Sequence, residues 1–342
     1  MVESITYREK SILKELIHKY ILTANPVGSN QIALNGDIGL KSASVRRIMS
    51  GLEEKGFVFQ PHTSAGRVPT TAGYRLYVNE LMTMDKINPE NENEILDSIE
   101  SSDGDFTLLM KSIAGVLARL SSQLGVIVSP KFEQGVFEKI HIIPVSSDKY
   151  MIVISVKDGQ VKTIIIEHRQ RINQSAIKRT VNKINQRLHG KTLMEIKNHF
   201  PDVMSDLKNE ESGLVRLFSE TAEKLFDFKR YDNYTINGTS NILQKPEFIN
   251  SEQISTLIEL LEDKNIIIHF MGERETPPGI KVTIGDEHLR SEIKECSVIT
   301  STYRIGGISG ILGIIGPTRM PYQKMIPLIQ FTADAITSSL NS

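Results

Sequence analysis

The chain has 342 residues, of which 39% are hydrophobic and 24% charged, and its 40 Lys and Arg against 41 Asp and Glu give a formal net charge of −1. This length predicts two or three domains, and the composition excludes collagen-like, disordered and membrane-embedded proteins. The single cysteine, Cys296, excludes an internal disulfide and a cysteine-based zinc site. With no secretory leader and no apolar run of about 20 residues, the protein is expected in the cytoplasm, without a membrane partner.

The N-terminal elements follow the order of a helix-turn-helix. Thr6 and Glu9 have capping-box spacing, which predicts the start of a first helix. Pro26 and Gly28 break that helix, and Ser29 is placed to cap a short second helix.

A third helix and a hairpin come next. Ser42 is placed to cap the helix, whose apolar residues recur at helical spacing as far as Leu52. Two short strands at 57–60 and 67–68 then flank a tip that contains Pro, Ser and Gly, which is the pattern of a wing. The order of these elements predicts a winged helix-turn-helix that binds double-stranded DNA.

The third helix and the wing carry the candidate DNA contacts. A buried stripe around Val45 and Met49 leaves Arg47 on the opposite face, with Arg46 on its flank. Guanidinium groups match phosphate oxygens and the guanine edge in the major groove, and a polar tip suits phosphates or a narrow minor groove. A solvated surface is the competing interpretation, and for His62 both stay open. The candidates are Ser42, Ser44, Arg46, Arg47, Ser50, His62, Thr63, Ser64 and Arg67.

The rest of the chain alternates helical and strand-like segments. Strands are expected at 137–145, 150–156, 161–167, 231–236, 266–270, 280–284, 297–303 and 308–315, with a helical block between the third and fourth and a helix at the end. This pattern predicts the α+β class. We divide the chain into a DNA-binding domain at 1–85, an acidic linker at 86–103, an α+β domain at 104–170 and 231–342, and a helix-rich insertion at 171–230.

Signals of catalysis or of a cofactor are poor. Asp286, Glu287 and His288 follow a strand and have side chains that bind metals, but an acidic solvated turn is the stronger interpretation. A glycine series suggests a phosphate-binding loop, yet Ile and Leu residues run through it as in a buried strand; it comprises Gly306, Gly307, Gly310, Gly313 and Gly316. We expect neither an enzyme nor a bound cofactor or metal.

Taken together, these residues resemble the HrcA family of bacterial heat-inducible transcription repressors over nearly the whole chain. The motifs that carry the resemblance are Pro26-Val27-Gly28-Ser29, the segment 42–52, the segment 60–67 with Pro69-Thr70, Gly73-Tyr74-Arg75, Asn237-Gly238-Thr239-Ser240-Asn241, and the segment 313–320 with Tyr322. The chain departs from the family at Arg47, where Asn is common, at Ser44, where Thr is usual, and at Asn25, where Glu is frequent. Arg47 puts the base preference at one operator position in doubt.

The resemblance implies a winged-helix domain, a GAF-like domain and an inserted dimerisation domain. It implies a homodimer that represses chaperone operons by binding CIRCE, an inverted-repeat operator. It also implies dependence on the chaperonin GroEL, which keeps such repressors competent to bind DNA. The alternative is a ligand-sensing winged-helix regulator, in which a small molecule bound to the GAF-like domain sets DNA affinity.

Overall fold

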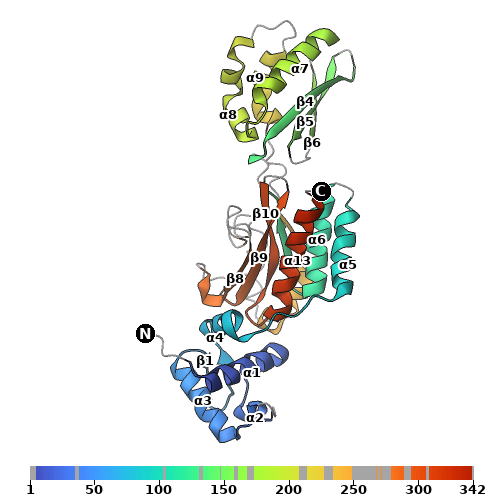
Figure 1. Cartoon of the computed structure of the whole chain (residues 1–342). Helices are drawn as coiled ribbons and strands as arrows, with labels where there is room; N and C mark the ends of the chain where they lie inside the picture. Colours follow the sequence, from blue (N-terminus) through green and yellow to red (C-terminus); the bar gives the residue numbers. More distant parts are fainter. Residues whose placement is uncertain are drawn as a thin grey trace. The chain divides into compact units, whose positions relative to one another are not determined.

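The computed structural model describes residues 5–34, 38–102, 105–130, 134–146, 148–157, 161–167, 173–207, 214–226, 234–248, 267, 271, 279–288, 294–305 and 308–340. Its helices and strands confirm the α+β class (Figure 1). The chain divides into two compact units. Unit 1 comprises Met1–Ile127, Thr235–Thr302 and Leu312–Ala335, and unit 2 comprises Val128–Tyr234, Tyr303–Ile311 and Ile336–Ser342.

Unit 1 begins with an N-terminal module of helices and one hairpin. Its elements are α1 (Tyr7–Thr23), α2 (Ser29–Ala33), α3 (Ser42–Glu54), β1 (Val58–Phe59), β2 (Val68–Pro69), α4 (Thr71–Leu76) and the π-helical turn η2 (Tyr77–Leu81). The buried side chains of α1 and of α3 form its core: Ile12, Leu13, Leu16, Ile17, Val45, Met49 and Leu52. The predicted order of three helices and a two-stranded hairpin is therefore confirmed.

The caps of the three helices were predicted with mixed success. The Thr6–Glu9 capping box is present, because the Thr6 backbone N–H donates to Glu9 Oε2 at 2.8 Å. The caps expected at Ser29 and Ser42 are wrong, since Gly28 and Lys41 occupy those positions. The hydroxyls of Ser29 and Ser42 lie 3.0 Å apart and form a hydrogen bond that joins α2 to α3.

A five-stranded sheet has the order β7-β3-β10-β9-β8. Its strands are β3 (Leu124–Val128), β7 (Tyr234–Asn237), β8 (Ile280–Ile284), β9 (Cys296–Ile305) and β10 (Ile308–Pro317). Helices α5 (Pro89–Glu100), α6 (Phe106–Ser121) and α13 (Tyr322–Leu340) lie side by side on one face of it (Figure 1). The strands expected at 280–284, 297–303 and 308–315 are confirmed. The strand expected at 266–270 lies outside the described residues, apart from Ile267.

The glycines of β10 belong to a buried strand. A Cβ atom on Gly313 would lie 2.2 Å from the Ile299 carbonyl oxygen, so the neighbouring strand leaves no room for a side chain. The isoleucines between these glycines are buried. Gly306 and Gly307 lie outside the described residues. The described part of the series therefore supports the buried strand rather than the phosphate-binding loop.

The acidic segment at 86–103 differs from the expected linker. Most of it forms helix α5, whose start is capped by the Asn88 side chain, which accepts a hydrogen bond from the Glu90 backbone N–H. Ile95 and Ile99 are spaced one helical turn apart and are buried, and α5 packs against α6. Within 86–103, residues 86–88 precede the helix and have no helix or strand, Ser101 and Ser102 form a turn after it, and residue 103 lies outside the described residues.

Unit 2 holds a second sheet. Strands β4 (Phe137–Pro144), β5 (Lys149–Val156) and β6 (Val161–Glu167) form an antiparallel sheet in that order, and the unit also contains helices α7 (Gln174–Leu188), α8 (Leu193–Val203) and α9 (Leu214–Leu225). Asn185 of α7 accepts from the Ile140 backbone N–H at 2.7 Å and donates to its carbonyl oxygen at 3.1 Å. The strands were expected in the same domain as the later strands, with the insertion starting at 171. They instead group with the helices, because α7 covers their buried face.

Candidate nucleic-acid interface

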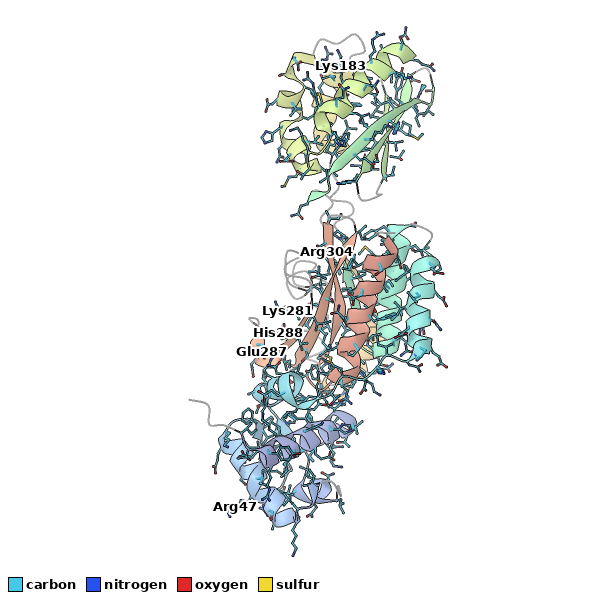
Figure 2. All side chains as sticks on the ribbon, in the orientation of Figure 1. Arg47, Lys183, Lys281, Glu287, His288 and Arg304 are labelled. Atoms are coloured by element: carbon cyan, nitrogen blue, oxygen red, sulfur yellow. The ribbon has the colours of Figure 1, made fainter. Side chains whose placement is uncertain are left out.

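Helix α3 presents a polar face to solvent. Val45, Met49 and Leu52 are buried, so the helical repeat turns Ser44, Arg46 and Arg47 outward, and all three are exposed. Figure 2 shows Arg47 on the outer side of α3. No described side chain forms an ion pair with either arginine. This placement confirms the predicted orientation of the helix and leaves both guanidinium groups available to an anionic partner.

Ser42 and Ser50 are less accessible than predicted, since both are only partly exposed. The Ser42 hydroxyl bonds with Ser29, as described above, and the Ser50 hydroxyl donates to the Arg46 carbonyl oxygen at 3.2 Å. Both hydroxyls are therefore engaged within the module. Ser44 is the expected serine of α3 that is exposed.

The tip between β1 and β2 is exposed and internally braced. His62, Thr63 and Ser64 all face solvent. The Gln60 side-chain amide donates to the carbonyl oxygens of Thr63 at 3.0 Å and Ala65 at 2.8 Å, which closes the tip. The sequence pattern predicts Gln60 in the hairpin, but no local motif indicates this bracing role. The tip presents two hydroxyls and an imidazole on a turn of defined shape.

The base of the hairpin is fastened to the turn between α1 and α2. Val27 and Arg67 exchange two backbone hydrogen bonds of 2.9 Å and form an isolated antiparallel bridge. A Cβ atom on Gly66 would lie 2.3 Å from the Val27 carbonyl carbon, so only glycine fits there. Two motifs that the sequence analysis noted separately, at 26–29 and at 60–67, therefore meet in the structure.

Arg67 is directed into the module rather than outward. Its Nη2 atom lies 2.8 Å from Glu53 Oε2 of α3, and its side chain is only 15% exposed. The guanidinium group therefore joins the hairpin to α3. In this arrangement the Arg67 side chain does not face solvent, as a direct DNA contact would require.

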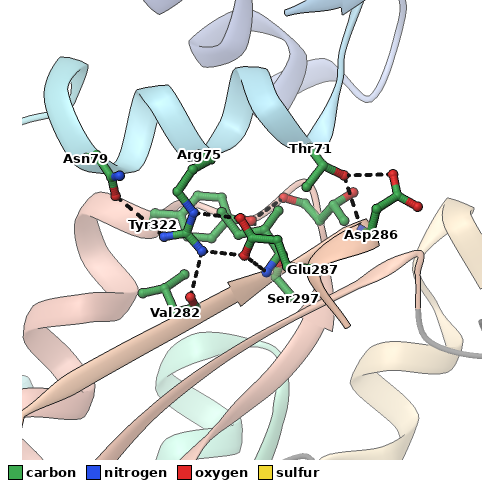
Figure 3. A network of polar contacts seen from close by, with 10 residues as sticks. Thr71, Arg75, Asn79, Val282, Asp286, Glu287, Ser297 and Tyr322 are labelled. Atoms are coloured by element: carbon green, nitrogen blue, oxygen red, sulfur yellow. Dashed lines mark hydrogen bonds and ion pairs between the residues drawn. The ribbon is translucent and has the colours of Figure 1, made fainter. Parts of the chain in front are cut away.

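A polar network joins α4 to the turn that follows β8 (Figure 3). Arg75 Nε donates to Glu287 Oε1 at 2.7 Å, its Nη2 donates to Glu287 Oε2, and the same Nη2 donates to the Val282 carbonyl oxygen at 2.7 Å. Thr71 donates to Asp286 Oδ2 at 3.2 Å. The carboxylates of Asp286 and Glu287 thus bind α4, which neither the metal-site nor the solvated-turn interpretation anticipated.

Arg319 holds the end of α1. Its Nη1 donates to the Ile21 carbonyl oxygen at 2.7 Å, and its Nε donates to Glu247 Oε1 at 2.6 Å. A cation at a helix C-terminus neutralises carbonyl groups that lack partners within the helix. The arginine of the C-terminal motif therefore contacts the N-terminal module across most of the sequence.

Burial shifts the pKa values of the titratable groups near this network. Burial raises the pKa of the Cys296 thiol to about 12, so the thiol stays protonated and unreactive, as expected of a buried strand residue. Burial also lowers the pKa of His288. Burial raises the pKa of Glu287, but hydrogen bonds from Arg75 and from the Ile284 backbone N–H outweigh it, and the net shift is downward. Glu287 is therefore ionised at neutral pH.

Comparisons with known proteins agree over the whole chain. The sequence model of the family described as "HrcA protein C terminal domain" matches residues 108–326. A protein from Chlorobium limicola (strain DSM 245 / NBRC 103803 / 6330) is 33% identical over 356 residues, covering 98% of each chain. Others from Chlorobium chlorochromatii (strain CaD3) and Chlorobaculum parvum (strain DSM 263 / NCIMB 8327) are 34% identical and cover at least 98% of each chain. All three are named "Heat-inducible transcription repressor HrcA".

A solved structure described as a hypothetical protein has the same fold. It is 23% identical, covers 98% of this chain and 99% of its own, and superimposes with a TM-score of 0.63. Among the helices that the structure describes, none is both long and apolar enough to cross a membrane.

Proposed function

Because this chain belongs to the HrcA family of heat-inducible transcription repressors, we propose that it acts as a homodimer on the CIRCE inverted repeat, with its activity dependent on the chaperonin GroEL. It is a negative regulator of heat-shock transcription. The observation that carries the DNA-binding proposal is the solvent-exposed face of α3. On this face, Arg46 and Arg47 form no ion pair with any described residue.

We assign the N-terminal module as a winged helix-turn-helix, with α3 as the recognition helix and the β1–β2 hairpin as the wing. In such modules the recognition helix enters the major groove. Arg46 and Arg47 then reach phosphates or the acceptor edge of guanine, because a guanidinium group can donate two parallel hydrogen bonds. Ser44 lies on the same exposed face.

The other expected DNA contacts divide into two groups. His62, Thr63 and Ser64 face solvent on the wing tip, where they suit phosphate contacts. Ser42, Ser50 and Arg67 are engaged within the module, and we assign them to positioning the recognition helix and the wing. This assignment revises the expectation that all nine residues contact DNA.

The homodimer follows from the symmetry of the operator, because an inverted repeat is matched by a two-fold protein. The sheet of unit 2 offers a surface for it. Side chains alternate across the sheet, so the face opposite α7 carries Met151 and its register partners Ile143 and Ile165. Ile143 is 45% exposed and Ile165 is 61% exposed. Exposed apolar side chains in adjacent register positions fit a self-complementary contact.

The ligand-sensing alternative would act through the GAF-like domain, to which we assign the five-stranded sheet and its helices. A cavity of about 490 Å³ lies beside α4 and α13 in unit 1. Its charged lining residue, Arg75, is already paired with Glu287. The cavity thus lacks a free charged group to orient a ligand, and we favour the chaperonin-dependent repressor.

The test is a mobility-shift titration on a CIRCE duplex and on a scrambled duplex of equal length, with and without GroEL, at two salt concentrations. If each protomer neutralises about three to five phosphates, the logarithm of affinity falls with the logarithm of salt concentration at a slope of about −5 to −9 for the dimer. We expect CIRCE-selective binding that GroEL strengthens. Equal binding to both duplexes would contradict operator recognition, and no effect of GroEL would contradict the chaperonin dependence.

A further inference from the structure

Two motifs that the DNA-contact surface does not use meet each other in unit 1. The ring of Tyr74, next to Arg75, packs against the ring of Tyr322 with their centroids 6.0 Å apart, and both side chains are buried. The Tyr77 hydroxyl donates to Gln323 Oε1 at 2.7 Å. We call this region the joint and define it by Tyr74, Arg75, Glu287, Arg319 and Tyr322.

The joint holds the N-terminal module at two separate elements. Glu287 binds α4 through Arg75, and Arg319 binds the C-terminal end of α1 through the Ile21 carbonyl oxygen. Arg319 is itself fixed by Glu247, and both side chains are largely buried. Two fixed points on different helices restrain rotation of the module as well as its separation from the sheet.

The covalent connection alone does not impose this restraint. Residues 82–88, which connect η2 to α5, have no helix or strand. An extended chain spans about 3.3 to 3.6 Å per residue, so a segment of this length would let a released module reorient by many ångströms. The side-chain contacts of the joint therefore set the direction in which α3 points.

We propose that Arg75, Glu287 and Arg319 are positioning residues that fix the spacing of operator half-sites which the dimer accepts. The inference rests on the proposed function, because it assumes two recognition helices on one inverted repeat and a dimer that holds its two copies of unit 1 in a fixed relation. Each half-site must present its major groove where the partner helix lies, so a rigid joint makes binding depend on the spacer. A loosened joint lets either module turn to follow a displaced half-site.

The experiment compares affinities for two operators that differ only in the spacer, one native and one longer by about 5 base pairs, which is half a helical turn. The readout is the ratio of the two affinities, because a loss of folded protein lowers both equally. Wild-type protein is expected to prefer the native spacer by about tenfold or more. Glu287→Ala and Arg319→Ala are expected to bring the ratio to about twofold or below, mainly by improving binding to the long spacer relative to the native one.

The matched control is Glu80→Ala, which removes an ion pair with Lys10 inside the N-terminal module and should leave the ratio unchanged. If Glu287→Ala does not fold, Glu287→Gln tests the same contact with little change in shape. Wild-type protein that binds neither operator selectively over scrambled DNA would overturn the proposed function. Wild-type protein with a strong spacer preference that both joint variants retain would overturn the inference alone.

Discussion

The Nη2 atom of Arg67 in the hairpin lies 2.8 Å from the Oε2 atom of Glu53 on α3. The pair joins the two elements that we assign to DNA recognition. A hydrogen-bonded ion pair of this kind that is partly shielded from solvent contributes about 1 to 2 kcal/mol. The position of the hairpin relative to α3 therefore depends on a contact between these two elements.

Arg67→Met and Glu53→Gln are expected to lower operator affinity by similar factors, because either change releases the wing. Each should also lower the free energy of unfolding by about 1 to 2 kcal/mol, and the double variant should cost less than the sum. Operator titration and urea unfolding measure both effects. A direct phosphate contact by Arg67 would instead reduce the salt slope by about one for Arg67→Met and not for Glu53→Gln.

Arg46→Ala and Arg47→Ala are expected to weaken binding by about 1 to 3 kcal/mol for each side chain that makes a bidentate base contact. Titration against operators changed at single base pairs locates the contact, because a base-reading arginine loses discrimination at one position. Equal weakening on every sequence would assign that arginine to a phosphate. Lys14→Ala, on α1 in the same module, is the charge-matched control and should change neither affinity nor selectivity.

Ile165→Asp is expected to dissociate the dimer, because a carboxylate on the apolar face of the unit 2 sheet would be buried without a partner. Sedimentation measures the mass, and operator affinity should fall with it. Met194→Asp on α8, in the same unit and 46% exposed, is the matched control. A dimer that survives Ile165→Asp would place the two-fold contact elsewhere.

The Arg75–Glu287 pair is expected to stabilise the protein at neutral pH and to lose that contribution in acid. The pKa of Glu287 in the folded protein lies below its ordinary value of 4.5, so the contribution is present above that value and disappears as pH falls through the lower, folded value. The difference in melting temperature between wild type and Glu287→Gln should be constant from pH 7 to about 5 and should shrink as pH falls below 4.5. A difference that changes between pH 6 and 8 would implicate another group.

Local patterns in the sequence predicted the local structure well. The Thr6–Glu9 box and the stripe of Val45, Met49 and Leu52 depend on residues three or four apart, and the structure contains both. The expected caps at Ser29 and Ser42 failed because the two hydroxyls bond to each other across 13 residues. Local spacing does not reveal a hydrogen bond to a distant residue, so it assigned both serines the wrong role.

Contacts between distant residues also explain why only part of the candidate site could be predicted. The exposure of Ser44, Arg46 and Arg47 follows from helical periodicity, whereas the partner of Arg67 lies on another element. Arg75 and Glu287 were each noted in the sequence, but 212 residues separate them and no local pattern connects them. The three strands of the unit 2 sheet were likewise predicted. No local pattern indicated that α7, rather than the later strands, would pack against them.

The most direct test of operator recognition by α3 is cleavage of the operator by an iron chelate attached through Ser44→Cys. The native thiol does not interfere, because Cys296 is buried and its pKa is raised to about 12. Wild-type protein treated with the same reagent is the control. We expect two symmetric clusters of cleavage, one within each half of the inverted repeat. Uniform cleavage, or cleavage confined to the flanking DNA, would contradict the assignment of α3 as the recognition helix.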